Sequence, residues 1–425
     1  MSEIHTGDAF EVLDQLDANS VHAIVTDPPY GLAFMGRSWD DFEPQEYQEW
    51  CAEWAGKAMR VLKPGGHMLA FSGNRTHHRL FTGVEDAGYE IRDTITWHYG
   101  SGFPKALDVS KAMDKAAGKE GDYGEPKNKR GMTDIKRGHR GTETENEGYQ
   151  RPWKNDAEAV EKNRRKYTPA TDAAKQWDGF KTALKPATEY VVMARKSFDG
   201  TVAENVQTHG TGALNIDGAR IDAGKEYQYE TDAPISTDKS NSGWQRDAHN
   251  GVKRSSHEKG RYPANVVFDE QAAERLDREV GELESNDCVA KEFDNETEKY
   301  GSGLGTHRTE GYADAGGPSR YFYTSKASKS ERTENGSIDN SHPTVKPVDL
   351  MEWLVTLVTK ENQIVLDPFC GSGTTGKACK AKNRDFIGIE KQPKWADVAR
   401  VRCGLTPEDP SVVREDDSQQ GLEQF

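Results

Sequence analysis

Two segments with an alternating strand and helix pattern stand at opposite ends of this 425-residue chain, and neither holds enough strands for a sheet of its own. The first segment covers residues 1–112 and the second covers 326–404. Their apolar patterns predict strands at 21–26, 67–71, 93–97, 363–366 and 385–389, and helices at 45–61, 348–359 and 374–381. Because strands that alternate with helices form parallel sheets covered on both faces, the two segments together predict one doubly wound α/β sheet.

The middle of the chain is polar and rich in glycine. We interpret 113–181 as a basic polar insertion or mobile loop, 182–198 as a strand that returns to the sheet, and 199–325 as a loop-rich attached region. A turn is expected at 63–66, within Lys-Pro-Gly-Gly. Residues 405–425 form an acidic tail that is expected to fray.

Charge and cysteine content limit the class of protein. The net charge of −15 is unfavourable for a partner that carries phosphates, unless basic residues gather locally or the whole proteome is acidic, as in salt-loving cells. We favour the second, halophilic interpretation slightly. The five cysteines form no pattern with zinc spacing, so neither a metal site nor a disulfide framework is expected. With no signal peptide and no membrane-spanning stretch, the chain is expected in a reducing cytoplasm.

A glycine loop follows the strand at 363–366 and opens a helix. Gly371 and Gly373 would let the backbone approach a ligand at the carboxyl end of the sheet. Glu390 ends the next strand, where a carboxylate can accept hydrogen bonds from ribose hydroxyls. The loop is not a P-loop, but together with Gly376 it satisfies the pattern of a dinucleotide site, which stays open at this point.

Asp27-Pro28-Pro29-Tyr30 follows the strand at 21–26. The two prolines stiffen the turn and leave carbonyls without neighbouring donors. A carboxylate and a carbonyl held rigidly can both accept from one NH2 group, which would position that amine and stabilise positive charge developing on it. Tyr30 offers a flat face for a base taken out of a double helix. The simpler alternative is an ordinary proline turn with Asp27 as a cap.

Together these motifs resemble the permuted, β-class DNA methyltransferases that modify the N6 of adenine or the N4 of cytosine. The similar segments are TDPPYG (26–31), MRVLKPGGHMLAF (59–71), HPTVKPVDLMEWLV (342–355), VLDPFCGSGTTGKAC (365–379) and FIGIEKQPKW (386–395). Their order is that of the β class: the catalytic segment first, a polar middle, and the cofactor segment last. The resemblance implies a Rossmann-like fold, S-adenosylmethionine as cofactor and double-stranded DNA as substrate.

The resemblance also implies roles for single residues. Asp27 and the carbonyl of Pro28 would hold the target amine, Pro29 would complete the catalytic turn, and Tyr30 would stack on the base. The cofactor would be bound by Asp8, His342, Thr344, Lys346, Asp367, Phe369, Gly371, Gly373 and Glu390. The region 199–325 would recognise the target, and its candidate DNA contacts are Trp244, Arg246, Lys253, Arg254, Lys259 and Arg261.

Several alternatives remain open at this stage. By the tendency of the family that the chain resembles, Asp at the first position of the catalytic turn favours adenine N6 over cytosine N4. The lack of any Pro-Cys pair argues against a cytosine C5 enzyme. A DNA-binding protein without turnover and a dinucleotide-dependent oxidoreductase are the rival classes. Cys370 is expected to pack and the pair His77-His78 to be capping or solvated. The resemblance leaves a monomer or a homodimer, a separate restriction nuclease, and a prokaryotic or viral origin as expectations.

Overall fold

A computed structural model of the chain describes residues 2–32, 40, 42–102, 106–126, 162, 165–222, 230–233, 252–255, 259–284, 315–325, 329–342 and 344–413. The chain divides into two compact units. One consists of residues 1–100 and 188–425, and the other of residues 101–187.

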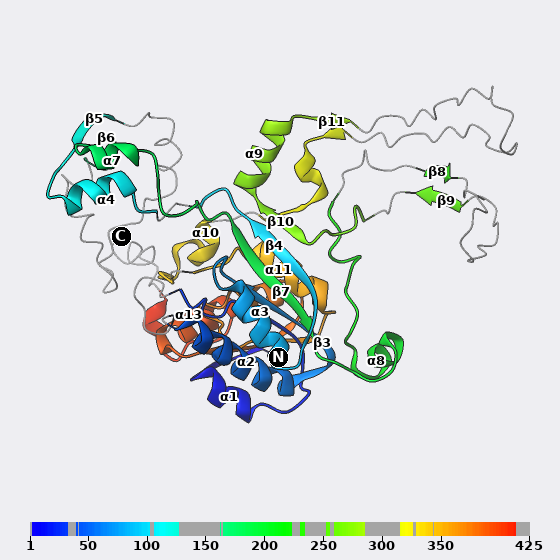
Figure 1. The fold of residues 1–425 in the computed structure, drawn as a ribbon. Coiled ribbons are helices and arrows are strands. Elements are labelled where there is room, and N and C mark those ends of the chain that lie inside the picture. The colour runs from blue at the N-terminus through cyan, green and yellow to red at the C-terminus, as the bar shows by residue number, and fades with distance from the viewer. Residues whose placement is uncertain are drawn as a thin grey trace, which may run out of the picture. The chain divides into compact units, whose positions relative to one another are not determined.

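A nine-stranded sheet lies at the centre of the first unit (Figure 1). In spatial order its strands are β1 (Ser2–Thr6), β15 (Asp385–Glu390), β14 (Ile364–Asp367), β2 (Val21–Thr26), β3 (Leu62–Ser72), β7 (Thr188–Arg195), β4 (Glu90–His98), β10 (Val266–Asp269) and β13 (Tyr323–Ser325). Neighbours are parallel except at β7, which runs antiparallel to both β3 and β4.

The two ends of the chain build this sheet together, as predicted. β14 and β15 come from the C-terminal segment and lie between β1 and β2 from the N-terminal segment. The predicted doubly wound, Rossmann-like α/β fold is therefore confirmed. Because β1, β15, β14, β2 and β3 are parallel, their carboxyl ends meet at one edge, and the antiparallel β7 begins at that same edge.

Helices cover both faces of the sheet. One face packs against α1 (Ala9–Gln15), α2 (Pro44–Val61) and α3 (His77–Asp86), and the other against α11 (Val348–Val358), α12 (Thr374–Ala381) and α13 (Pro393–Cys403). Side chains alternate between the two cores along a strand. In β2, Ile24 packs in the first core, whereas Ala23 and Val25 pack in the second. Proline at the first position and a capping box between Glu43 and Glu46 start α2.

The turn predicted at 63–66 lies inside β3, so that prediction is wrong in part. The pairing of β2 with β3 jumps from Val21 opposite Leu62 to Ala23 opposite His67, and the extra residues bulge out. Gly65 supplies the bulge with a φ of +76°. The strand therefore resumes in register after the irregular residues.

The polar middle contributes to the sheet, which the sequence did not predict. β10 and β13 both come from 199–325 and extend the sheet beyond β4. Residues 215–219 of the same region also hold α11 in place. Trp353 Nε1 donates to Ala219 O at 3.0 Å, and Asn215 N donates to Leu357 O at 2.8 Å. These described residues act as scaffold. The same region contains α8 (Val202–His209), α9 (Glu270–Val280), β8 (Glu230–Ala233) paired with β9 (Val252–Ser255), β11 (Leu283–Glu284) paired with β12 (Ala315–Gly316), and the short helix η5 (Pro318–Tyr321).

The second unit contains regular structure where an insertion or loop was predicted. Its elements are α4 (Val109–Ala116), α7 (Asp172–Gln176) and the pair β5 (Asp122–Pro126) and β6 (Arg165–Thr168). The buried carboxylate of Asp114 accepts from Tyr167 Oη, from Ala170 N, and from both N and Oγ1 of Thr171. One carboxylate thus joins α4 to β6 and to the start of α7, a long-range contact that local sequence does not reveal.

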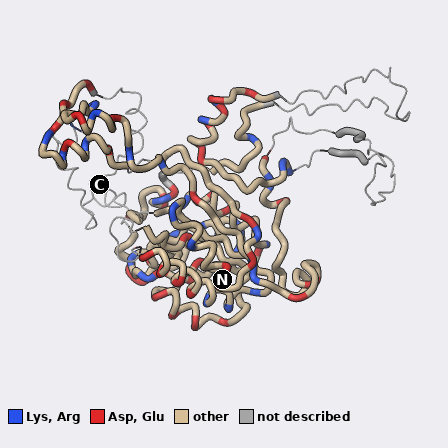
Figure 2. The backbone as a smooth tube through the Cα atoms, viewed as in Figure 1, with Lys and Arg blue, Asp and Glu red and all other residues tan. Residues whose placement is uncertain are grey.

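The predicted fraying from residue 405 is wrong as far as residue 413. Asp397 accepts from the backbone N–H groups of Glu408 and Asp409, η7 covers Pro410–Val412, and Val413 bridges to Ile338. Residues 414–425 lie outside the described residues. Acidic and basic residues are interspersed along the backbone of both units (Figure 2). None of the described helices is long and apolar enough to cross a membrane.

Candidate active site

The Asp-Pro-Pro-Tyr turn lies at the carboxyl end of β2 and is held from several sides. Tyr47 Oη in α2 donates to Pro29 O at 2.8 Å, and Thr76 Oγ1 donates to Tyr30 O at 2.6 Å. The buried carboxylate of Asp40 accepts from the next two backbone N–H groups, those of residues 31 and 32. The backbone of the turn is therefore fixed by contacts from three segments, as a positioning site requires.

Four polar side chains converge beside this turn, and we call them the Lys346 cluster: Asp27, Tyr30, Glu189 and Lys346. Tyr30 Oη lies 2.8 Å from Asp27 Oδ1 and 3.0 Å from Glu189 Oε2. Lys346 Nζ lies 2.6 Å from Asp27 Oδ2, 3.1 Å from Tyr30 Oη and 3.3 Å from Glu189 Oε2. Glu189 stands at the start of β7, so its carboxylate reaches the edge where β2 ends.

The electrostatics of the cluster keep both donors protonated. Burial alone would lower the pKa of Lys346, but the nearby carboxylates of Asp27 and Glu189 raise it above its ordinary value. Burial, followed by the same two carboxylates, raises the pKa of Tyr30. The cluster thus contains an ammonium group and a phenol as donors and two carboxylates as acceptors, with one more negative than positive charge.

The glycine loop between β14 and α12 has the backbone that the sequence predicted. Gly373 has a φ of +80°, and a Cβ atom there would lie 2.7 Å from Ala399 Cα. Gly371 has a φ of +51°, and its Cβ would meet the ring of His342 at 3.1 Å. No other residue fits either position without strain, because the backbone is left-handed and the neighbouring side chain or helix lies too close for a Cβ atom.

Asp367 begins this loop and is fully engaged inside the protein. Its Oδ1 accepts from Thr26 Oγ1 at 2.6 Å and from Phe369 N at 3.1 Å, and its Oδ2 accepts from Thr375 Oγ1 at 2.6 Å. Burial raises the pKa of Asp367 to about 6. These bonds join β14 to β2 and to the first turn of α12, so Asp367 connects the glycine loop to the strand that carries Asp27.

Two further predicted residues lie together at the ends of β1 and β15. Gly7 N donates to Glu390 O at 3.0 Å, which brings Asp8 beside Glu390. Asp8 caps α1 through Phe10 N and pairs with Lys391 at 3.0 Å. Burial raises the pKa of Glu390, whose Oε1 accepts from Gln392 N. Both carboxylates therefore lie where β1 and β15 end, at the same edge of the sheet as the glycine loop.

Aromatic rings border the same loop on two sides. Phe369 packs against Trp50 and Trp54 of α2, each with ring centroids 5.4 Å away. The ring of His342 stands edge-on to Trp395, with centroids 5.0 Å apart. Thr344 is exposed, and its backbone N–H lies 3.5 Å from Nδ1 of His342.

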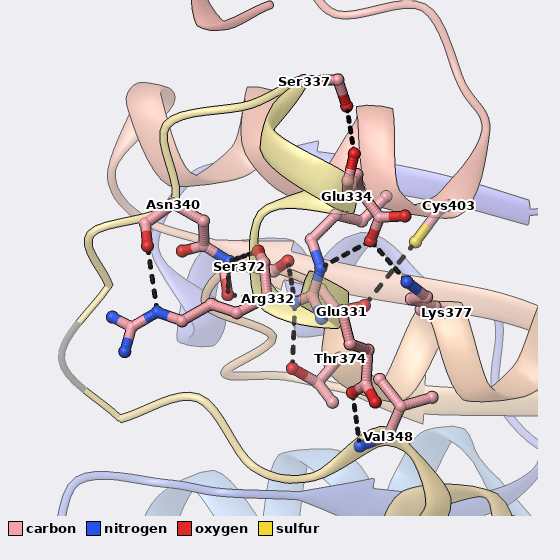
Figure 3. A network of polar contacts seen from close by, with 12 residues as sticks. Glu331, Arg332, Glu334, Ser337, Asn340, Val348, Ser372, Thr374, Lys377 and Cys403 are labelled. Carbon is pink, nitrogen blue, oxygen red and sulfur yellow. Dashed lines mark hydrogen bonds and ion pairs between the residues drawn. The ribbon is translucent and has the colours of Figure 1, made fainter. Parts of the chain in front are cut away.

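A polar network fastens residues 329–342 onto the glycine loop (Figure 3). Arg332 donates to the carbonyls of Asn340 and His342, and Asn340 Nδ2 donates to Ser372 Oγ at 3.2 Å. The segment includes α10 (Lys329–Arg332) and η6 (Glu334–Gly336). Glu334 Oε1 accepts from Lys377 Nζ of α12 at 2.5 Å. This network fixes the position of His342 over Gly371.

The structure places most of the predicted site residues at one edge of the sheet, but one of them belongs to a different group than predicted. Lys346, assigned to the cofactor by resemblance, contacts the catalytic turn. Sequence reasoning missed Glu189, Asp40, Tyr47 and Thr76. Only Glu189 carried a signal: a carboxylate at the start of a strand, directly before the apolar run YVVMA. The other three act through contacts with the backbone of the turn that span 8 to 46 positions of the sequence.

The remaining candidates divide into packed and exposed residues. Arg261 is buried, donates to Arg320 O at 3.0 Å and covers the ring of Tyr321, so its predicted contact with DNA is wrong. Lys259 lies at the surface, 4.0 Å from Asp217. His77 stacks on the ring of Tyr190. Cys370 is buried, in agreement with a packing role. Trp244, Arg246 and the side chains of Lys253 and Arg254 lie outside the described residues.

Comparison with known proteins supplies the family. Residues 21–400 match the model of the N6/N4 DNA methylase family. The chain is 22% identical to the type II methyltransferase M.HindIII of Haemophilus influenzae over 95% of each chain, and 41% identical to M.HinfI of the same species over 20% of this chain and 23% of that one. Among solved structures, it is similar to the cytosine-N4-specific PvuII DNA methyltransferase, with 13% identity, a TM-score of 0.43 and coverage of 94% of this chain and 86% of that one.

Proposed function

Because this chain belongs to the N6/N4 DNA methylase family and is a DNA methyltransferase, we propose that it methylates the exocyclic N6 of adenine in double-stranded DNA. The family membership excludes the dinucleotide-dependent oxidoreductase that the glycine pattern left open. A DNA-binding protein without turnover is disfavoured because the catalytic turn is complete and rigidly held. The observation that carries the proposal is the carboxylate of Asp27, fixed at the carboxyl end of β2 beside the glycine loop.

S-adenosylmethionine is the cofactor that membership of the DNA methylase family implies, and it supplies a methyl group bound to a positively charged sulfur. The described residues fit it, since Gly371 and Gly373 place no side chain on a loop that follows a parallel strand, and the carboxylates of Asp8 and Glu390 lie at the ends of the neighbouring strands. We propose that Glu390 and Asp8 accept from its adenosine part, that Phe369 borders its rings, and that His342 and Thr344 lie at its methionine end. Asp367 supports the loop from beneath.

The proposed role of Asp27 is to accept hydrogen bonds from the target amine together with the Pro28 carbonyl. Positive charge develops on the amine nitrogen as its bond to the methyl group forms and the methyl–sulfur bond breaks, and a fixed carboxylate stabilises that charge until the nitrogen loses a proton to solvent. Tyr30 is proposed to face the flipped base. No covalent intermediate on the protein is required for this direct transfer.

Adenine is favoured over cytosine by the aspartate at the first position of the turn, which by resemblance is commoner in adenine enzymes. Cytosine N4 is the second candidate, because its NH2 group presents the same donors to Asp27. The PvuII enzyme carries no weight for this choice, since its likeness to this chain concerns the fold alone.

The proposal is tested by analysis of modified bases. Wild type and Asp27→Ala are expressed in a host without DNA methylation of its own, and the digested DNA is analysed by mass spectrometry. We expect N6-methyladenine with wild type and none with D27A. An N4-methylcytosine product would overturn the choice of base but keep the mechanism, and absence of any methylated base would refute the proposed function.

We further propose how the enzyme acts in the cell. Its substrate is double-stranded DNA in the cytoplasm of a prokaryote, or of the infected prokaryotic host if the enzyme is viral. A separate restriction nuclease would share its target sequence. Residues 199–325 outside the sheet strands are proposed to recognise that sequence. The enzyme is proposed to act as a monomer or homodimer, as the family resemblance suggests.

A further inference from the structure

Both oxygens of Asp27 already have partners inside the protein. Oδ1 accepts from Tyr30 Oη at 2.8 Å and Oδ2 accepts from Lys346 Nζ at 2.6 Å. The side chain of Asp27 is 17% exposed and that of Lys346 is 9% exposed, so water screens their contact little. The target amine must therefore compete with an ammonium group for the carboxylate that is proposed to bind it.

The charge of Lys346 also opposes the reaction where it stands. The amine nitrogen becomes positive during methyl transfer, and an ammonium group bonded to the same carboxylate repels that charge and weakens the stabilisation by Asp27. Lys346 cannot simply be left without a carboxylate, because a buried unpaired ammonium group is strongly unfavourable. A second acceptor within reach is needed.

Glu189 provides that acceptor. Its Oε2 lies 3.3 Å from Lys346 Nζ and 3.0 Å from Tyr30 Oη, whose single proton can be donated to either carboxylate. Glu189 comes from β7, whereas Asp27 follows β2, so the two carboxylates flank Lys346 from separate strands. The rings of Tyr30 and Phe71 lie 5.4 and 5.0 Å from Nζ and stabilise a cation between the two positions.

We propose that Glu189 is a positioning residue that takes Lys346, and with it the Tyr30 hydroxyl, from Asp27 when the target base binds. This inference rests on the proposed role of Asp27. The exchange keeps the ammonium group paired throughout and returns the full charge of Asp27 to the target amine. Glu189 thereby acts on the reaction through Lys346 without touching the base.

The test is a double-mutant cycle of Glu189→Gln and Lys346→Met. Single-turnover methyl transfer to unmethylated bacterial genomic DNA is measured at saturating S-adenosylmethionine, and binding of S-adenosylmethionine is measured separately by equilibrium dialysis. We expect E189Q to lower the rate at least about tenfold, while its affinity for S-adenosylmethionine stays within about twofold of wild type. K346M is expected to keep a measurable rate, and adding E189Q to it is expected to change that rate less than about twofold.

Three kinetic results would overturn the proposal. They are a wild-type rate for E189Q, an equal slowing by E189Q with and without Lys346, and complete inactivity of K346M. Glu90→Gln is the matched control, because Glu90 pairs with Arg195 at the opposite end of β4 and β7 and its loss should leave the rate unchanged.

A thermal-unfolding cycle of the same variants separates this inference from the proposed function. E189Q is expected to lower Tm when Lys346 is present and to leave it unchanged in the K346M background. If wild type methylated no DNA, the proposed function would fail, and additive effects on Tm would still refute the pairing of Lys346 with Glu189.

Discussion

Asp367 illustrates how one buried residue sets a measurable property of the fold. Its carboxyl group is 2% exposed and binds Thr26, Phe369 and Thr375, so that it joins two strands and a helix. Burial outweighs these hydrogen bonds and raises its pKa from 3.8 to about 6. The folded state therefore binds a proton at Asp367 more tightly than the unfolded state does.

The first prediction follows from the sign of this shift. The contribution of Asp367 to the free energy of unfolding is largest below pH 4, decreases as pH rises from about 4 to 6, and stays low above 6. A raise of this size corresponds to about 3 kcal/mol. Asp367→Asn cannot titrate, so subtracting its urea-unfolding free energy from that of wild type across pH 4–7 should give this slope.

The free energy of unfolding must be compared between wild type and D367N, because another buried group changes its pH dependence in the opposite direction. Burial lowers the pKa of His67 to about 4, so its contribution to stability is lost as pH falls from about 6.5 to 4. Parallel curves for D367N would contradict the raised pKa of Asp367.

The glycine loop gives a prediction at the scale of an element. Gly373→Ala forces a left-handed backbone on alanine and puts Cβ 2.7 Å from Ala399 Cα, within the contact between α12 and α13. We expect a loss of about 2–4 kcal/mol of stability together with weaker binding of S-adenosylmethionine. Chemical denaturation and equilibrium dialysis measure the two effects.

Gly56→Ala is the matched control for this loop variant. Gly56 lies in α2, and a Cβ atom there would meet no atom within 4 Å. Alanine is a better helix former than glycine, so G56A should stabilise the protein by about 0.5–1 kcal/mol. A G373A protein as stable as wild type would show that α13 can move away from the loop.

Elements with a strong local pattern were predictable from sequence, and elements defined by distant partners were not. The span of β2 agrees with its prediction, as does that of α12, because an apolar run or a glycine loop marks their ends. β10 and β13 have four and three residues and no alternation of their own, so only pairing with β4 and with each other makes them strands. Glu189 escaped assignment because its role depends on β7 running antiparallel.

At the scale of the whole molecule, the order of the motifs along the chain predicted the shared sheet, but it did not predict which residues meet there. The sequence order of the catalytic turn and the glycine loop implied one shared sheet, and the interleaving of β14 and β15 with β1 and β2 confirms it. Which side chains meet across that sheet was beyond prediction. Lys346 and Asp27 are 319 positions apart, and their contact depends on the packing of the segment before α11.

The net charge of −15 leads to the last prediction, which concerns salt. An excess of acidic residues repels phosphates and also destabilises a compact chain, and dissolved ions screen both effects. If the chain is adapted to a salt-rich cytoplasm, methyl transfer and thermal stability should persist or increase between about 0.1 and 2 M KCl, although phosphate binding ordinarily weakens as salt rises. Radiolabelled methyl transfer and Tm are measured across this range with genomic DNA as substrate.

Two outcomes of the salt series separate protein adaptation from DNA binding. Loss of activity with an unchanged Tm would mean that basic residues dominate DNA binding and that the acidic surface brings no tolerance. Loss of activity together with a lower Tm at moderate salt would refute the halophilic interpretation, because an acidic surface adapted to salt stabilises the folded state at such salt concentrations. Retention of both would imply that DNA is held chiefly by base contacts and shape, since such contacts release few counterions.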